Sequence, residues 1–340
     1  MAKVCVLHVG GTIGMVRGPR GLEPQSGFVE QYLETMGTLT RPDIPDFDLV
    51  ALEPILDSAE MAPRDWIRVA QGITERASKY DGFVVLHGTD TMVYTASALS
   101  YLLQRQSKPV VFTGAQLPLE HPRSDAREHI VTSLILAGEL EVPEVCIYFG
   151  SRLLRGNRAQ KVNNNDFVAY ASGNLPPLAK VGVGIEVNHH LLLAPGKGRM
   201  TMATLDREPV VVAIRVFPGM TASTFSAILS SPVEGVVLET YGAGTFPVSD
   251  KELMGALQDA SERGLVIVNC SQCHSGYVRQ ELYATSRPLG EVGVVSGHDM
   301  TPEAALTKLY CLLGAGIDPA SARTRMGEDL AGEITIGPAA

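Results

Sequence analysis

The sequence predicts an α/β fold of two domains, each with a mainly parallel β-sheet flanked by helices. Short apolar runs rich in Val and Ile alternate with longer segments of helical period. Most of these runs are continuous rather than alternating, which is typical of strands that helices cover on both faces. The length of 340 residues also exceeds the roughly 250–300 residues at which a single core stops growing.

Eight apolar runs are candidate strands, and helical segments separate most of them, which predicts parallel pairing with right-handed crossovers. They are "VCVLHV" (4–9), "GFVVLH" (82–87), "PVVFTG" (109–114), "EVCIYF" (144–149), "VVVAIRV" (210–216), "GVVLET" (235–240), "GLVIVN" (264–269) and "GVVSG" (293–297).

Three segments carry clear helix signals. Residues 91–106 place apolar side chains at helical spacing before a proline. Residues 249–264 begin with Ser249 as the expected N-cap, and residues 301–314 begin with Thr301 followed by proline in the first turn.

The strand–helix rhythm breaks once, at residues 191–208, where Pro, Gly and charged residues accumulate. We expect this stretch to be a linker between an N-terminal domain, 1–190, and a C-terminal domain, 209–340.

The composition is that of a soluble globular protein with an ample core. Hydrophobic residues make up 45% and charged residues 19%, and the net charge is −9. An acidic chain without Lys/Arg blocks is not expected to bind nucleic acid or an anionic membrane non-specifically. No apolar stretch approaches the roughly 18 residues that span a bilayer. The N-terminus has no cleavable signal, so a cytoplasmic location is expected.

The five cysteines form an odd, sparse set that suits a reducing compartment. Cys270-x-x-Cys273-His274 matches a haem attachment pattern, but the preceding apolar run and the absent export signal favour a structural or incidental pair. The eight histidines show no metal-ligand spacing such as H-E-x-x-H. We expect neither a metal nor a cofactor.

Three loops of the first domain have the same form, with small or hydroxyl-bearing residues directly after a strand. They are Gly10-Gly11-Thr12-Ile13-Gly14, "HGTDTM" (87–92) and "TGAQLP" (113–118). Because parallel strands end at the same edge of a sheet, Thr12, Thr89 and Asp90 are expected to converge there.

These residue types suggest nucleophilic chemistry. A threonine hydroxyl needs a base beside it, and a desolvated lysine coupled to an aspartate can serve, since burial lowers an ammonium pKa. Lys161 is the candidate base, although spacing alone favours a surface lysine. Asp90 is expected to start the following helix, with a plain N-cap as the alternative. The nearby arginines also fit a solvated basic face: Arg152, Arg155 and Arg158.

"GGTIG" followed by "HGTDTM" resembles the L-asparaginase family, the bacterial-type threonine amidohydrolases, and is most similar to its cytoplasmic type I branch. The resemblance runs from about residue 4 to the C-terminus and implies an asparaginase-like fold. Further matching stretches are "LDSAEM" (56–61), "PVVFTGAQLPL" (109–119), "RGNRAQKV" (155–162), "NLPPL" (174–178), "PG" (218–219) and "GHDMTPEAALTKL" (297–309).

The resemblance implies metal-independent hydrolysis of L-asparagine to L-aspartate and ammonia through a threonine acyl-enzyme. Thr12 would be the nucleophile. Thr89, Asp90 and Lys161 would form a second hydroxyl–acid–base set, with Asp90 also binding the α-ammonium of a small amino-acid substrate.

The resemblance also implies the surroundings of the site. Asp57 and Ser58 would lie beside the substrate's head group, and backbone N–H groups near Thr89 and Ala115 would stabilise the oxyanion. The polar, glycine-rich segment 14–27 would be a lid, with an ordinary flexible loop as the alternative reading. A homodimer or homotetramer is implied, and no nucleic-acid or membrane partner.

The sequence departs from the family pattern at several positions. Leu22 stands where the family has a lid tyrosine, Ala59 where a polar side chain is usual, Thr245 where asparagine is common, and Glu239 where some type I members carry a basic residue. Three tyrosines could supply a replacement hydroxyl: Tyr32, Tyr277 and Tyr310.

Four other functions compete with the L-asparaginase prediction. They are a glutaminase-asparaginase of broader specificity, the amidase subunit of a tRNA-dependent amidotransferase, a non-catalytic asparagine binder and a dinucleotide-binding protein. The amidotransferase subunits usually carry an extra N-terminal segment, whereas this chain begins at the strand. Dinucleotide binding is disfavoured because the sequence has neither the G-x-G-x-x-G spacing nor the acidic residue that would bind the ribose.

Overall fold

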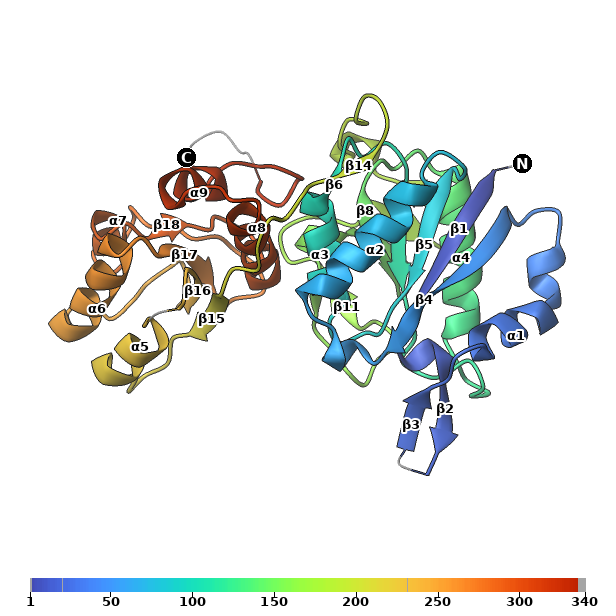
Figure 1. Ribbon diagram of the computed structural model, residues 1–340, viewed down its shortest axis with the longest axis horizontal. Helices are drawn as coiled ribbons and strands as arrows, with labels where there is room; N and C mark the ends of the chain where they lie inside the picture. The colour runs from blue at the N-terminus through green and yellow to red at the C-terminus, as the bar shows by residue number, and fades with distance from the viewer. Residues whose placement is uncertain (1, 20, 231, 336–340) are drawn as a thin grey trace. The chain divides into compact units, whose positions relative to one another are not determined.

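The computed structural model describes residues 2–19, 21–230 and 232–335, which divide into two compact units. The first comprises the chain up to Ser172 together with Pro176–Ala203, and the second comprises Gly173–Leu175 and the chain from Thr204. Each unit has its own sheet and helices (Figure 1). The division after Ala203 falls inside the stretch 191–208.

An eight-stranded mixed sheet forms the centre of the first unit. Its five strands on one side are parallel, and three antiparallel strands continue it on the other side. The order across the sheet is β13 (Ile185–Val187), β12 (Ala179–Val181), β9 (Arg152–Arg155), β8 (Val145–Phe149), β7 (Val110–Thr113), β5 (Gly82–Leu86), β1 (Lys3–Gly10) and β4 (Asp46–Leu56).

The four strands expected in this domain are confirmed, and they are buried as their continuous apolar runs predicted. Every residue of β5, β7 and β8 is buried, as is β1 from Val4 onward. Strand β4 was not predicted. It lies at the edge of the sheet, where one side has no partner strand, and its half-exposed sequence mixes charged and apolar residues.

Helices cover both faces of the large sheet (Figure 1). Gly72 of α2 packs against Leu7, and Gly138 of α4 packs against Val4. Residues three apart in a strand point to opposite faces, so α2 and α4 lie on opposite sides of β1. The helices of this unit are α1 (Phe28–Thr35), α2 (Pro63–Arg76), α3 (Met92–Leu102) and α4 (Ala126–Glu139).

The crossovers do not all have the same hand. Helix α3 packs beside α2, so α3 and α4 lie on opposite faces (Figure 1). The connections β5–α3–β7 and β7–α4–β8 step in the same direction across the sheet. Two connections that step the same way on opposite faces have opposite hands, so the prediction of uniformly right-handed crossovers is wrong for one of them.

Three short antiparallel pairs complete the first unit. Two of them lie near the sequence motifs, and the third joins the end of α3 to the segment before Ala203. The pairs are β2 (Met15–Gly18) with β3 (Gly21–Pro24), β10 (Gln160–Lys161) with β11 (Tyr170–Ala171), and β6 (Leu103–Gln104) with β14 (Thr201–Met202).

The second unit contains a four-stranded parallel sheet between two layers of helices. Val236 and Leu238 pack with α5 and α6, whereas Val237 packs with α8 and α9, as expected for a strand covered on both faces. The elements are β15 (Val211–Arg215), β16 (Gly235–Thr240), β17 (Val266–Ser271), β18 (Val295–Ser296), α5 (Ala222–Ile228), α6 (Lys251–Glu262), α7 (Arg287–Glu291), α8 (Pro302–Gly314) and α9 (Pro319–Met326).

Helix capping in this unit follows one prediction and corrects another. Thr301 caps α8 by accepting the N–H of Ala304, as predicted. Ser249 does not cap α6, because Asp250 occupies that position and accepts two backbone N–H groups. A carboxylate satisfies the same free donors and also complements the helix dipole.

A buried ion pair fixes the last described segment to α8. The Lys308 ammonium lies 2.6 Å from a carboxylate oxygen of Glu333, and both side chains are fully buried. The Glu333 carboxylate also accepts the backbone N–H groups of Leu330 and Ala331. Each charge therefore depends on the other for its compensation.

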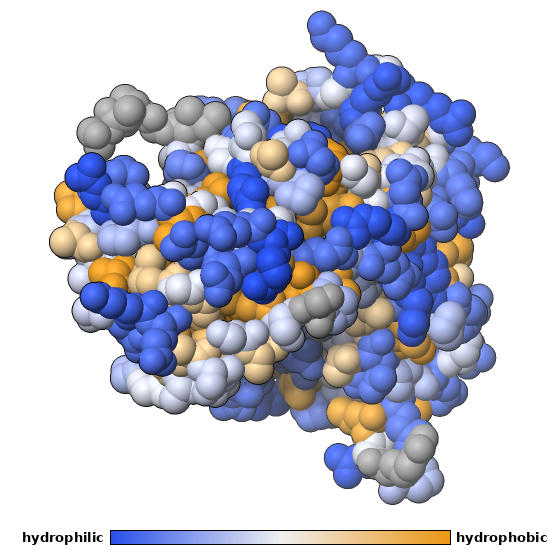
Figure 2. Space-filling model, turned by 60° about the vertical axis from the view of Figure 1, so that its left-hand side comes forward, coloured by the Kyte–Doolittle hydropathy of each residue, from blue (hydrophilic) through white to orange (hydrophobic). Residues whose placement is uncertain are grey.

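Hydrophilic residues cover much of the face shown in Figure 2, with apolar residues visible between them. Within the described ranges, no helix has the length and apolar character needed to cross a membrane.

Candidate active site

Two glycines bring the loops after β1 and β5 into direct contact. Gly11 has a φ of 92°, and a Cβ there would lie 2.3 Å from the Cα and N atoms of Gly88. A Cβ on Gly88 would lie 2.4 Å from Oγ of Ser58, which follows β4. The loops therefore meet through backbone and small side chains, and they place Thr12 and Thr89 at the same edge of the sheet, as the motif spacing predicted.

Lys161 reaches the same edge from the short strand β10. Its ammonium donates to Oγ1 of Thr89 at 2.8 Å and to Oδ1 of Asp90 at 2.6 Å. The Lys161 side chain is only 17% exposed, whereas that of Asp90 is 65% exposed. Lys161 is thus not a surface lysine: it links the threonine hydroxyl to the carboxylate.

Tyr170 holds the backbone of this cluster. It pairs with Lys161 across β10 and β11, and its hydroxyl donates to the backbone carbonyl of Thr89. Its ring is buried and packs edge-on against Phe149, with 5.0 Å between centroids. Burial raises the pKa of the phenol well above its usual value, so Tyr170 remains a donor. The sequence offered no signal for it, because a two-residue strand has no periodicity.

Asp90 does not start α3 and is not its N-cap. The cap position is Thr91, whose hydroxyl donates to the carbonyl of Ser58 at 2.8 Å, and α3 begins at Met92. The Asp90 carboxylate is left to bind Lys161. The basic-face reading of the arginines also fails, because Arg155 and Arg158 are buried and Arg155 pairs with Glu144.

Asp57 and Ser58 lie on the neighbouring loop. The Asp57 carboxylate accepts the N–H of Ala59 at 3.0 Å and is half-buried, while Ser58 is buried against the Gly88 loop. Ala115 is buried just beyond the end of β7. The backbone N–H groups of Thr89 and Ala115 donate to no backbone carbonyl in the described part of the chain.

His87 stabilises the loop that carries Thr89. Its ring is fully buried, with Nδ1 2.7 Å from the carbonyl of Gly88 and Nε2 2.8 Å from Oγ1 of Thr95. Burial lowers the pKa of His87 to about 4, so the ring is neutral at pH 7. It fixes the position from which Thr89 extends.

Within the segment 14–27, Met15–Gly18 (β2) and Gly21–Pro24 (β3) pair as antiparallel strands. Strands β2 and β3 project from the first unit in Figure 1, and Gln25 N–H donates to the carbonyl of Gly14 at their base. Leu22 pairs with Arg17 and is 48% exposed. Of the tyrosines considered as substitutes, Tyr32 has its hydroxyl engaged by Arg127 at 2.9 Å.

Residues 3–193 match the family model described as "Asparaginase, N-terminal", and residues 210–326 match "Glutaminase/Asparaginase C-terminal domain". The chain belongs to the asparaginase family. The resemblance found from the motifs and the two-domain α/β fold are confirmed.

Asparaginases are also its relatives by overall sequence and structure. The chain is 41% identical to "L-asparaginase 1" of Escherichia coli (strain K12) over 333 residues, which cover 98% of each chain. Its fold matches L-asparaginase I from Vibrio cholerae with a TM-score of 0.91 and 37% identity, over 98% of this chain and 99% of that one. It also matches the thermostable L-asparaginase from Thermococcus kodakarensis with a TM-score of 0.88 and 33% identity, over 98% and 100% of the two chains.

The cysteine pair noted in this asparaginase-family chain lies in the second unit. Cys270 is buried in β17, Cys273 is exposed, and both are free thiols. In the described ranges, no group of three or more His, Cys, Asp or Glu side chains is placed to hold a metal ion.

Proposed function

We propose that this chain hydrolyses L-asparagine to L-aspartate and ammonia through an acyl-enzyme on Thr12. Membership of the asparaginase family supports the reaction, and one observation supports the residue assignment. Lys161 of β10 is hydrogen-bonded to Thr89 and Asp90, which follow Gly88 on the loop that touches Gly11. A hydroxyl, a carboxylate and an amine at a strand edge match what a threonine nucleophile needs.

In the first half-reaction, Oγ1 of Thr12 attacks the carbon of the side-chain amide. Its proton passes to the Thr89–Lys161 pair and then to the leaving nitrogen, so that the C–N bond breaks and ammonia departs. Charge develops on the amide oxygen as the bond forms. The free N–H groups of Thr89 and Ala115 are the donors we assign to that oxygen, with a typical contribution of about 3 kcal/mol each.

In the second half-reaction, water adds to the acyl carbon and the ester bond to Thr12 breaks. Thr89 and Lys161 take the proton from water, and the Thr12 oxygen recovers one on leaving. Asp90 acts through charge. Its exposed carboxylate holds Lys161 in position and offers oxygens to the α-ammonium of the substrate.

We assign the substrate's head group to the loop of Asp57 and Ser58. The Asp57 carboxylate uses one oxygen on Ala59 N–H, which leaves the other for a cationic donor. We further propose that the β2–β3 hairpin closes over the bound amino acid and excludes water. Leu22 supplies apolar cover there rather than a proton.

The test is ammonia release from L-asparagine by the wild type and by Thr12→Ala, with Thr35→Ala as the control. Thr35 is an exposed threonine of α1 whose hydroxyl donates to the Tyr32 carbonyl. We expect the Thr12 variant to lose at least 10³-fold in kcat, since catalysis without a nucleophile falls by this order, and the control to be unchanged. Equal activity of the wild type, Thr12→Ala and Thr35→Ala would refute the assignment of Thr12 as the nucleophile. Calorimetric binding of asparagine without turnover by the wild type would identify a non-catalytic binder.

A second pair of variants separates the two roles of Lys161. Lys161→Arg keeps the positive charge beside Asp90 but cannot lose a proton. Lys161→Met removes both the positive charge and the group that can exchange a proton. If Lys161 acts as a base, both variants are inactive. Activity retained by Lys161→Arg alone would reduce Lys161 to an electrostatic role. Lys180→Arg, at an exposed position of β12, is the control.

We also propose that the enzyme works in the cytoplasm as a homodimer or homotetramer. Five free cysteines suit a reducing compartment, and the oligomer is what the family resemblance implies. Light scattering would give two or four times the 36.4 kDa of the chain. A mass of one chain at micromolar concentration would contradict the proposal.

A further inference from the structure

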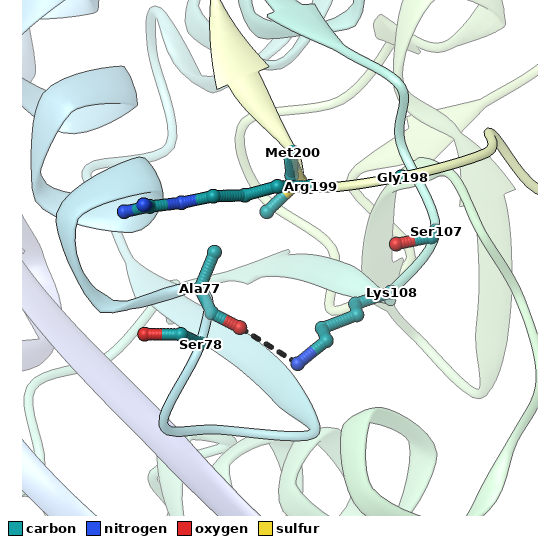
Figure 3. Close-up of a pocket in the computed structure, with 7 residues that line it drawn as sticks. All are labelled: Ala77, Ser78, Ser107, Lys108, Gly198, Arg199 and Met200. Carbon is teal, nitrogen blue, oxygen red and sulfur yellow. Dashed lines mark hydrogen bonds between the residues drawn. The ribbon is translucent and has the colours of Figure 1, made fainter.

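A cavity lies near the N-terminal ends of the parallel strands of the large sheet. Thr12 and Thr89 follow the C-terminal ends of these strands. The volume of the cavity is about 340 Å³, which falls in the range of small-ligand sites. Three segments line it (Figure 3): residues 77–78 after α2, residues 107–108 before β7 and residues 198–200 before β14. The first two segments precede strands whose far ends carry the catalytic loops, so a strand length of roughly 16 Å separates the two places.

The charges around this cavity are opposite to those of the chain as a whole. The chain has a net charge of −9, yet the lining contains two cations, Lys108 and Arg199, and no acidic residue. Within two positions of the lining segments lie three exposed basic residues, Lys79, Arg105 and Lys197, against one exposed acidic residue, Glu75, which pairs with Arg76. Such a local reversal of sign attracts an anion.

Two backbone carbonyls hold Lys108 in place. Its ammonium donates to the carbonyl of Ala77 at 2.7 Å and to the carbonyl of Tyr80, and Figure 3 shows it pointing to Ala77. These carbonyls follow the C-terminal end of α2, where the helix dipole favours a positive charge. An ammonium has three N–H donors, so one remains for a ligand while the side chain is already ordered.

Arg199 supplies the second cation. It is exposed, and its guanidinium has no ion-pair partner within the described ranges. In Figure 3 its side chain extends away from Lys108, and its guanidinium lies beyond Ala77. Ser78 and Ser107 add hydroxyl donors, and Met200 and Ala77 add apolar surface.

We propose that this cavity binds a small phosphomonoester, with the phosphate between Lys108 and Arg199 and the organic part against Met200. The guanidinium fork binds phosphate oxygens in pairs, and a dianion matches two cations and two hydroxyls. A ligand there would tie residues 198–200 to the end of α2. Its binding would therefore stabilise the fold without touching the catalytic loops.

The experiment is calorimetric titration of the wild type with glycerol 3-phosphate, inorganic phosphate and L-aspartate, with melting temperatures measured in parallel. Arg199→Ala is compared with Arg64→Ala, which removes an equal charge from an exposed position at the other end of α2. We expect saturable binding of glycerol 3-phosphate, a raised melting temperature, and affinity reduced at least about tenfold by Arg199→Ala but unchanged by Arg64→Ala.

Three outcomes would overturn the proposal: no saturable binding, equal affinity in the two variants, or L-aspartate binding as tightly as the phosphomonoester. If inorganic phosphate binds and glycerol 3-phosphate does not, the proposal that the ligand carries an organic group is wrong. Asparagine hydrolysis by Arg199→Ala should stay at the wild-type rate, so the test is independent of the proposed catalytic function.

Discussion

The contact between Gly11 and Gly88 gives the sharpest test of how the fold builds the active site. A Cβ at Gly11 would sit 2.3 Å from two backbone atoms of Gly88 and 2.8 Å from the carbonyl carbon of His87. Ordinary van der Waals contact begins at 3.4 Å. Because the opposing atoms are backbone, no rotamer change relieves the overlap. In Gly11→Ala the loops of Thr12 and Thr89 must separate by about 1 Å.

Gly219 is a matched control for the backbone strain. It has the same φ of 92°, but an added Cβ would have no neighbour within 4 Å. Both alanine variants carry the strain of a positive φ, about 1–3 kcal/mol. Gly11→Ala also carries an overpacking cost of about 1–3 kcal/mol. A misplacement of about 1 Å between reacting groups costs on the order of 10²-fold in rate.

Urea unfolding and the kcat/KM for ammonia release would measure both effects. We expect Gly219→Ala to lose stability while keeping the wild-type kcat/KM. Gly11→Ala should lose more stability and about 10²-fold in kcat/KM. Equal kcat/KM in the two variants would refute the claim that this contact sets the distance between the two threonine loops.

Three further predictions concern groups that are buried. Tyr170→Phe leaves the Thr89 carbonyl without its donor, so the free energy of unfolding should fall by about 1–3 kcal/mol and kcat should fall with it; a variant with wild-type kcat would remove Tyr170 from the site. His87 has its pKa lowered to about 4 and is neutral in the folded protein. The unfolded chain therefore binds one more proton between pH 6.5 and pH 4, so stability is fully present above pH 6.5 and falls by about 3 kcal/mol towards pH 4; His87→Gln should remove this part of the urea-midpoint profile, and an unchanged profile would contradict the assignment. Lys308→Met leaves Glu333 buried without a counter-charge and should cost about 3–5 kcal/mol, most of which the double variant with Glu333→Gln should recover; additive losses in urea unfolding would show that the pair is not coupled.

The sequence was informative wherever local pattern and burial agree. Strands such as β5 and β8 are buried on both faces, so their apolar runs marked them directly. The convergence of Thr12 with Thr89 followed from a geometric rule, since parallel strands end at one edge. The sequence did not predict β4, because this strand lies at the edge of the sheet. A half-exposed strand tolerates charged residues and shows no clear alternation of apolar and polar residues.

Long-range contacts were beyond the sequence. Tyr170 lies 81 positions from the carbonyl it binds, and nothing in its neighbourhood distinguishes it from a core aromatic residue. The Lys161 spacing also allowed a surface position, and only the pairing of β10 with β11 directs it to Asp90. The opposite hands of two crossovers depend on which face each helix covers, which period alone does not specify.

Trapping the acylated residue tests the central claim most directly. The wild type would be incubated with an electrophilic asparagine analogue, digested and mapped by mass spectrometry, with Lys161→Met as a comparison. We predict one equivalent of label on the peptide containing Thr12, and slower labelling in the variant. Label on Thr89 or any other side chain, with Thr12 unmodified, would contradict the account.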